Sequence, residues 1–158
     1  MNAEQGERVR QLLTRQRWAA LATQCQDGSP SVSHVAYVAE TDFNGFLLHV
    51  SKLAAHTRNL LARPAVSLAV SEPDNGEDDP QLLARLTING TASEIPRHSE
   101  DYLSARQRYL MGLPWAERLF GFEDFVLVRV FPQTARFVGG FAQTLQLTAE
   151  QLRRLATL

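Results

Sequence analysis

The chain has 158 residues, of which 44% are hydrophobic and 21% are charged, and its formal net charge at pH 7 is -1. This composition is typical of a folded globular protein, and we expect a single domain over residues 1–158. A net charge so close to zero gives no general attraction to nucleic acid or anionic lipid, so neither is expected as a partner.

The cysteine and histidine content and the apolar runs exclude further classes of site and location. Cys25 is the single cysteine, which excludes an intramolecular disulfide and a cysteine-based metal cluster. The four histidines show no helical ligand spacing, so we expect no metal site. The N-terminal segment is polar and no apolar run is long enough to span a bilayer, so a cytoplasmic location is expected.

The first half of the chain predicts one helix and then strands that turn back on one another. Apolar spacing predicts an amphipathic helix over residues 4–17, and Asp27-Gly28 is a hairpin signal. A second turn is expected at residues 41–45. The strands are expected at 18–23, 31–40 and 46–50.

A short helix is expected between two apolar runs, 45–50 and 65–70. Ser51 is placed at its N-cap, and the helix should end at Arg63 because a residue before proline is pushed out of the α region. An acidic loop rich in glycine and proline follows the next strand, over residues 72–80.

The second half of the sequence predicts two further strands, one helix between them and one helix after the second strand. A strand over residues 82–95 contains Gly90, which indicates a β-bulge or a close backbone approach. The run 125–131 is apolar on both faces apart from Arg129, as expected for a central strand, and it resumes after a break at Pro132. Helices are expected at 99–110 and from Thr148, where Thr148 and Gln151 have capping-box spacing.

These elements predict a mainly β fold with peripheral helices. The strands follow one another in hairpin-like succession and are not separated by regular long helices. That order disfavours a doubly wound parallel sheet and favours an antiparallel barrel.

The segment from Ser51 to Arg58 is the strongest candidate binding site. Lys52, His56 and Arg58 place cationic groups near a helix N-terminus, which offers free N–H groups and partial positive charge to a phosphate. Neither of the glycine-rich dinucleotide and triphosphate loop motifs is present. The first hypothesis is therefore that this segment binds a phosphorylated ligand on a barrel wall. The alternative is that it is a short surface helix whose charges are only solvated.

Strand alternation sorts the nearby polar residues onto faces. Arg85 and Thr87 share one strand face, and Ser31 and Ser33 share another with His34 opposite to them. These groups could form a binding surface for a phosphorylated heterocycle near the cationic start of the helix.

Four stretches in this order resemble the FMN-binding split-barrel family related to pyridoxamine 5′-phosphate oxidase, and within it the haem-utilisation branch. The stretches are residues 28–35, the motif Ser51-x-Leu53-Ala54-x-His56-Thr57-x-Asn59-Leu60 before Pro64, residues 84–92, and residues 124–141, which end at Phe141. The resemblance implies a six-stranded antiparallel split β-barrel that forms a homodimer, with FMN in a groove between the subunits.

The resemblance also implies cofactor-binding residues. Ser33 and His34 would lie on a strand along the FMN site, and His56 stands where the oxidases have a phosphate-binding lysine. Arg58 is a nearby candidate for the phosphate, and Arg85 stands where the oxidases have a flavin-contacting glutamine. The full expected set is Ser33, His34, His49, Val50, Ser51, His56, Thr57, Arg58 and Arg85.

Two departures limit what the resemblance implies. The oxidases' C-terminal tryptophan and arginine have no counterpart, which does not favour vitamin B6 oxidation. The chain continues only briefly past Thr148, so we expect the extension of longer haem-utilisation members, with its haem-ligating residues, to be missing or only begun.

Three functional hypotheses follow. The first is a dimeric FMN-binding oxidoreductase that acts on an unidentified small molecule, with no catalytic residue identified. The second is a protein that binds haem or another tetrapyrrole on the same barrel without oxidase activity. The third is an interaction module whose groove no longer binds a cofactor.

Overall fold

One antiparallel sheet organises the fold in the computed structural model, which describes residues 1–140 and 143–157. Its strand order is β2-β1-β5-β6-β7-β4-β3, and β8 pairs with β7. Phe141, which ends the last of the four matching stretches, lies outside the described residues. The strands are β1 (Trp18–Gln24), β2 (Pro30–Ala36), β3 (Val38–Ala39), β4 (Phe46–Ser51), β5 (Ala65–Ser71), β6 (Arg85–Ile95), β7 (Phe125–Val138) and β8 (Thr144–Thr148).

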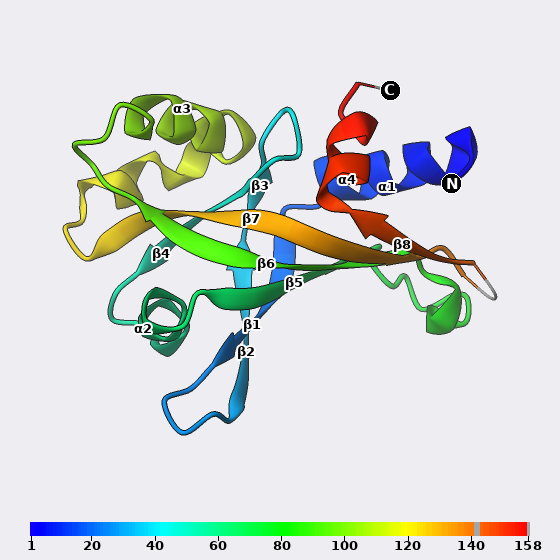
Figure 1. The fold of residues 1–158 in the computed structure, drawn as a ribbon, viewed down its shortest axis with the longest axis horizontal. Coiled ribbons are helices and arrows are strands. Elements are labelled where there is room, and N and C mark those ends of the chain that lie inside the picture. Colours follow the sequence, from blue (N-terminus) through cyan, green and yellow to red (C-terminus); the bar gives the residue numbers. More distant parts are fainter. Residues whose placement is uncertain (141–142, 158) are drawn as a thin grey trace.

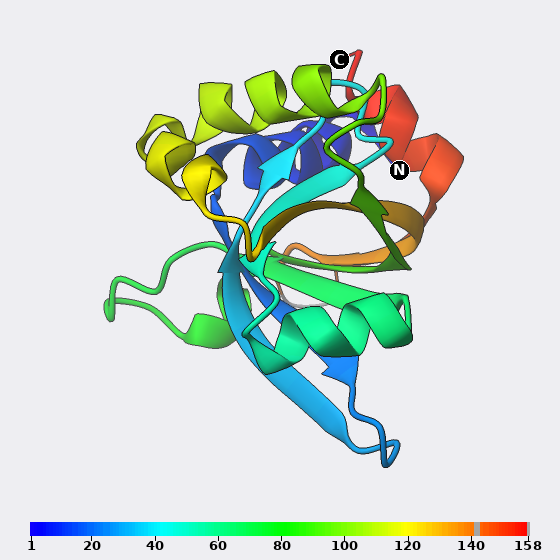
Figure 2. The ribbon, with the colours of Figure 1, turned by 90° about the vertical axis from the view of Figure 1, so that its left-hand side faces the viewer.

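The helices cover the sheet unevenly. The α-helices are α1 (Ala3–Arg15), α2 (Ala55–Ala62), α3 (Tyr102–Gly112) and α4 (Ala149–Leu155), and the 3-10 helices are η1 (Pro80–Leu82) and η2 (Pro114–Gly121). Helices α1, α3 and α4 gather on one side of the sheet, while the β1–β2 hairpin projects away from them (Figure 1). Figure 2 shows α2 across the curved sheet from α3. The predicted mainly β split barrel with peripheral helices is therefore confirmed. The strand expected over 31–40 is interrupted at Tyr37 and continues as β3, and β8 is an additional short strand.

The central strand is longer than the sequence predicted. β7 runs unbroken for 14 residues and pairs with β4, β6 and β8. The predicted break at Pro132 is wrong, because Pro132 lies opposite Gly90 at a register shift in β6 and needs no regular ladder bond there. A Cβ atom on Gly90 would lie 2.3 Å from the Phe131 carbonyl oxygen, so the predicted close backbone approach is confirmed.

Both terminal helices begin with a capping box. In α4 the Thr148 hydroxyl accepts from the Gln151 N–H and the Gln151 side chain accepts from the Thr148 N–H, as predicted. In α1 Asn2 and Gln5 form the same reciprocal pair, which the sequence analysis missed. The caps fix the first residue of each helix, and in α4 the cap ends β8 at the same point.

Two apolar clusters hold the layers together. The larger lies inside the barrel and includes Leu21, Leu48, Leu68 and Val128, all fully buried. The smaller packs α3 and η2 against the other face of β4 and β7, where Tyr109 and Phe120 are members. Successive residues of β4 therefore point alternately into one cluster and the other.

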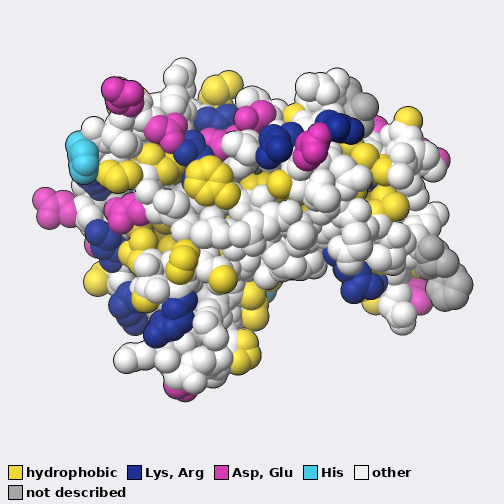
Figure 3. All heavy atoms as spheres, viewed as in Figure 1, with side chains coloured by type: hydrophobic (Ala, Val, Ile, Leu, Met, Phe, Trp, Pro, Cys, Tyr) yellow, Lys and Arg dark blue, Asp and Glu magenta, His cyan; other side chains and the backbone are white. Residues whose placement is uncertain are grey.

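The charged side chains are mixed on the face drawn in Figure 3. Lys and Arg lie interspersed with Asp and Glu along its upper part, in keeping with the near-zero net charge. In the described part of the chain, no helix is both long enough and apolar enough to span a membrane.

Candidate functional site

The segment after β4 forms a turn before it forms a helix. The N-cap of α2 is Ala54, without a side-chain hydrogen bond, so the prediction of Ser51 as the N-cap is wrong. The Ser51 hydroxyl instead donates to the Asp124 carboxylate at 2.5 Å and accepts from the Leu53 N–H at 3.1 Å. These bonds tie the end of β4 to the start of β7 and delay the helix by three residues. The predicted helix end at Arg63 is confirmed.

The cationic groups of α2 turn toward its start. Arg58 donates from Nη1 to the Leu53 carbonyl at 2.6 Å, which holds its guanidinium over the first turn. Burial lowers the pKa of the partly buried His56 below its ordinary value, so its positive charge is disfavoured. Thr57 is fully buried and its Oγ1 has no hydrogen-bond partner within the described chain. A phosphate at this segment would therefore depend on Arg58 and Lys52 for full charge, although Lys52 also lies 4.0 Å from the Glu94 carboxylate.

The two predicted residues of β2 lie on opposite faces of the sheet. Ser33 pairs with Leu21 and shares the inner face with it, whereas His34 pairs with Ala20 and is exposed on the outer face. The His34 ring stacks almost parallel on Trp18, with 5.8 Å between ring centroids and 11° between planes. His34 is thus an accessible imidazole on an open sheet face.

His49 lies in a closed aromatic environment. Its ring is 7% exposed and stacks on Phe120 at 3.7 Å between centroids, with Tyr109 and Phe125 around it. Neither ring nitrogen has a hydrogen-bond partner within the described chain. Burial lowers the pKa of His49 to about 4, and the charges of Arg97 and Arg106 act in the same direction.

The nine expected residues do not all meet within one chain. Ser51, His56, Thr57 and Arg58 come together at the start of α2, and Val50 points into the barrel core. Arg85 lies at the opposite end of β6 from the strand residues that meet Pro64 and Ala65. Since six residues separate Arg85 from Thr91, the gap along the strand is roughly 20 Å. The Arg85 guanidinium donates to the carbonyls of Gln81 and Leu83, both at 3.1 Å.

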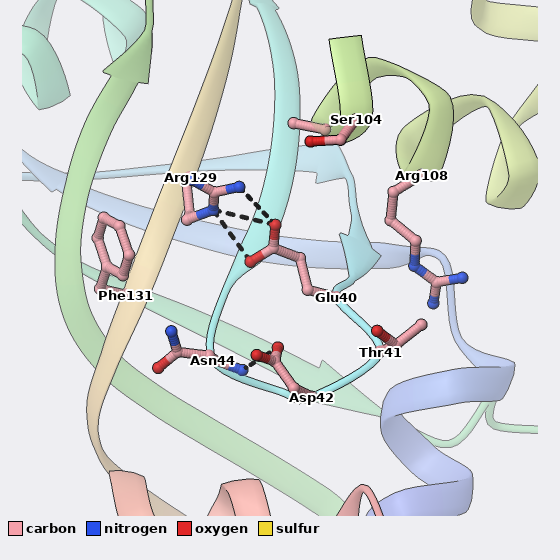
Figure 4. A pocket seen from close by; sticks show the side chains of 9 residues that line it. Glu40, Thr41, Asp42, Asn44, Ser104, Arg108, Arg129 and Phe131 are labelled. Atoms are coloured by element: carbon pink, nitrogen blue, oxygen red, sulfur yellow. Dashed lines mark hydrogen bonds and ion pairs between the residues drawn. The ribbon is translucent and has the colours of Figure 1, made fainter. Parts of the chain in front are cut away.

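A charged cluster that the sequence analysis did not assemble joins β7 to the neighbouring loops. Arg129 donates to the Glu40 carboxylate at 2.6 and 3.0 Å (Figure 4), and it also donates to the Asp101 carboxylate. It borders a cavity of about 410 Å³ whose other arginine, Arg108, donates to the Ala39 carbonyl at 2.7 and 3.0 Å. Because both guanidiniums are already bound to protein oxygens, the cluster holds the loops together. The one indication of this cluster in the sequence was Arg129, the single charged residue in the apolar run 125–131.

A groove at the end of α1 was also missed. It has a volume of about 520 Å³ and lies where α1, β1, β2 and η2 meet. Its lining residues are Arg15, Gln16, Arg17, Trp18, Ala36, Leu113 and Trp115. Within the described residues, no group of three or more His, Cys, Asp and Glu side chains could hold a metal ion by itself.

Comparison with known proteins identifies the family to which this architecture belongs. The profile of the family described as pyridoxamine 5′-phosphate oxidase matches residues 6–139. The haem oxygenase HutZ of Vibrio cholerae is 34% identical over 137 residues, which cover 84% of this chain and 74% of that protein. The chloroplastic non-canonical haem oxygenase HOZ of Arabidopsis thaliana is 33% identical over 141 residues, covering 86% of this chain but 40% of that protein.

The fold comparison gives the same result. The structure of a haem-binding protein from Mycobacterium smegmatis superposes with a TM-score of 0.84 at 28% identity, covering 98% of this chain and 62% of that one. The described chain therefore spans less than two thirds of two of these three proteins. The extent of the family match and the identity to HutZ show that this chain belongs to the pyridoxamine 5′-phosphate oxidase family, in the branch that contains the haem oxygenases HutZ and HOZ.

Proposed function

We propose that the protein binds haem, which was the second of the three functional hypotheses. The observation that carries the proposal is the exposed His34 imidazole, stacked on an exposed Trp18 on an uncovered face of the sheet. The haem named for HutZ, for HOZ and for the mycobacterial protein supports the choice of ligand. Haem oxygenation requires bound haem first, so haem binding is the function that we propose.

The donor set fits haem at His34 better than at His49. An imidazole nitrogen is a common iron ligand, and an exposed ring on an open face can be reached by a large flat molecule. His49 has two unpartnered nitrogens, but Phe120 covers its ring at stacking distance. When bound, haem supplies redox and oxygen chemistry through its iron. The chain's own part would be to hold the iron through His34 and to shelter the ring with apolar surface.

A matched pair of histidine variants tests this assignment. In titrations of the protein with hemin followed by the Soret band, His34→Ala should weaken binding roughly 100-fold, since it removes the iron ligand. His98→Ala is the control, because His98 is also exposed but lies in the loop after β6. Equal hemin affinity in His34→Ala and the unmodified protein would reject His34 as the ligand.

FMN binding remains the second candidate. The observation in its favour is the start of α2, where Arg58 is folded over the first turn beside Ser51 and His56. Charge-assisted bonds to a phosphate contribute about 1.5–3 kcal/mol each. The double variant His56→Ala, Arg58→Ala should therefore bind FMN at least about tenfold more weakly, as measured by quenching of flavin fluorescence. FMN affinity that the double variant leaves unchanged would contradict this phosphate site.

A homodimer with the cofactor between its subunits is also a proposal. Its support is the outer face of β1 and β2, where Trp18 is 59% and Val32 is 65% exposed. Trp18 and Val32 lie on the same face of this hairpin, four positions apart along the ladder, and an exposed apolar face of this kind can form a contact between subunits. In this arrangement Arg85 of a second copy could approach a site that Arg85 of the same chain cannot reach.

A further inference from the structure

The groove at the end of α1 combines two exposed aromatic rings with two arginines. It is lined by both tryptophans of the chain, Trp18 and Trp115, which come from β1 and η2. They are 59% and 73% exposed, although a tryptophan stabilises a protein most when its large ring is buried. The His34 ring stacks on Trp18 and the Arg17 guanidinium lies over Trp115, but more than half of each tryptophan stays exposed around the hollow.

The groove is also cationic. Its lining contains Arg15 and Arg17, and no carboxylate belongs to the lining among the described residues. Neither guanidinium makes a hydrogen bond or an ion pair within the described chain, in contrast to Arg129 and Arg108 in the cavity of Figure 4. The Arg17 guanidinium lies over the Trp115 ring, 5.5 Å from its centroid. That contact orients an otherwise mobile side chain and leaves its N–H groups available to an anion.

These properties select one class of ligand. A flat apolar ring system can lie against indole rings and aliphatic side chains, here Ala36 and Leu113. Two guanidiniums at the same rim suit a ligand with two carboxylates, because arginine binds carboxylates with paired N–H donors. A tetrapyrrole such as haem has a planar apolar macrocycle with two propionates on one edge. The volume of about 520 Å³ lies within the range of small-molecule sites.

The groove also adjoins the proposed iron ligand. Trp18 is a wall of the groove and at the same time the stacking partner of His34. Ala36 is two residues from His34 on β2, so their side chains point to the same face of the strand. The imidazole, the apolar walls and the cations are therefore contiguous on one rim of the molecule.

We infer that this groove is the tetrapyrrole site, with Trp115 against the macrocycle, Trp18 supporting the His34 ring by stacking, and Arg15 and Arg17 on the propionates. The inference rests on the proposed haem binding and adds its location. Arg15 also lies in the last turn of α1, where a cation stabilises a helix in any case, so Arg17 is the better residue to test.

The test is a hemin titration of Trp115→Ala and Arg17→Gln, each beside a control of matched exposure. Each variant should bind hemin about tenfold more weakly than the unmodified protein. Leu103→Ala, at an apolar residue of α3 that is also 73% exposed, and Arg136→Gln, at an exposed arginine of β7, should bind like the unmodified protein. None of the four side chains is in an apolar core cluster, so all the variants should fold.

Hemin dimethyl ester separates the role of the charges from that of the ring. Esterification removes the propionate charges, so it should weaken binding to the unmodified protein about tenfold and weaken binding to Arg17→Gln less. An equal loss in both proteins would overturn the assignment of Arg17 to a propionate.

The outcomes distinguish the location from the function. If the unmodified protein binds hemin and both groove variants bind it equally well, the inference is overturned and the proposed function stands. If the unmodified protein binds no hemin, both are overturned. If Trp115→Ala halves the mass measured by light scattering and leaves hemin affinity unchanged, the groove is a contact between subunits and the inference is overturned.

Discussion

Replacing Arg129 by methionine should lower the free energy of unfolding by about 3 kcal/mol, because it leaves the Glu40 carboxylate without its partner. The Arg129 and Glu40 side chains are 13% and 18% exposed, so water cannot fully replace the lost hydrogen bonds. The stem of Arg129 also packs over Gly45, where an added Cβ would lie 2.8 Å from the Arg129 Cγ. Urea denaturation at pH 7 measures the change.

The controls for Arg129→Met test whether the uncompensated charge is the cause. Arg118→Met, at an exposed arginine of η2, should change stability by less than about 0.5 kcal/mol. Adding Glu40→Gln to Arg129→Met should recover part of the loss, because it removes the buried charge. An unfolding midpoint in Arg129→Met equal to that of the unmodified protein would show a solvent-screened pair of little energetic value.

The same cluster has a pH signature. Hydrogen bonds from Arg129 lower the pKa of Asp101 below its ordinary value. A carboxyl with a lowered folded-state pKa stabilises the fold above its unfolded pKa, and this contribution is lost as the pH falls through the folded value. The stability difference between the unmodified protein and Arg129→Met should therefore shrink below about pH 4.

His49 should make the stability of the protein depend on pH in a higher range than the Arg129 cluster does. The unfolded chain takes up a proton on this residue near pH 6.5, whereas burial delays its protonation in the folded state to about pH 4. The unfolded state therefore binds more protons between these values, and stability should fall by about 3 kcal/mol as the pH drops from 6.5 to 4. In His49→Leu, which replaces the ring with an apolar group of similar size, this fall should largely disappear.

Two comparisons identify the His49 contribution. His98→Leu, at an exposed histidine, should keep the pH profile of the unmodified protein. The partly buried His56 has a pKa lowered by burial as well, so a small slope of the same sign should remain in His49→Leu. A His49→Leu profile identical to that of the unmodified protein would mean that His49 is hydrated or hydrogen-bonded in solution.

Local sequence signals predicted the sheet well where a single strand or turn decides the structure. Alternation and the Asp27-Gly28 turn predicted the β1–β2 hairpin, and the spacing of Thr148 and Gln151 predicted the start of α4. Gly90 indicated a close approach, but its partner Pro132 was interpreted alone and therefore as a break. The error arose because a bulge involves two strands, and one strand's sequence carries half of the information.

The candidate site was predicted less completely, because its contacts also join residues that are far apart in the sequence. Ser51 has the residue type of an N-cap, but Asp124, remote in the chain, binds its hydroxyl. His49 was placed correctly on a strand, whereas Phe120, which covers its ring, lies on η2. The groove depends on Trp115 and Trp18 lining the same hollow, and no local pattern encodes that arrangement.

The central claim, that this protein binds haem, is tested most directly by titrating the purified, cofactor-free protein with hemin and recording the Soret band. We predict a shifted Soret band whose intensity saturates at one haem per chain, and which FMN in excess does not abolish. A spectrum that stays that of free hemin, or that grows in proportion to added hemin without saturating, would contradict the account.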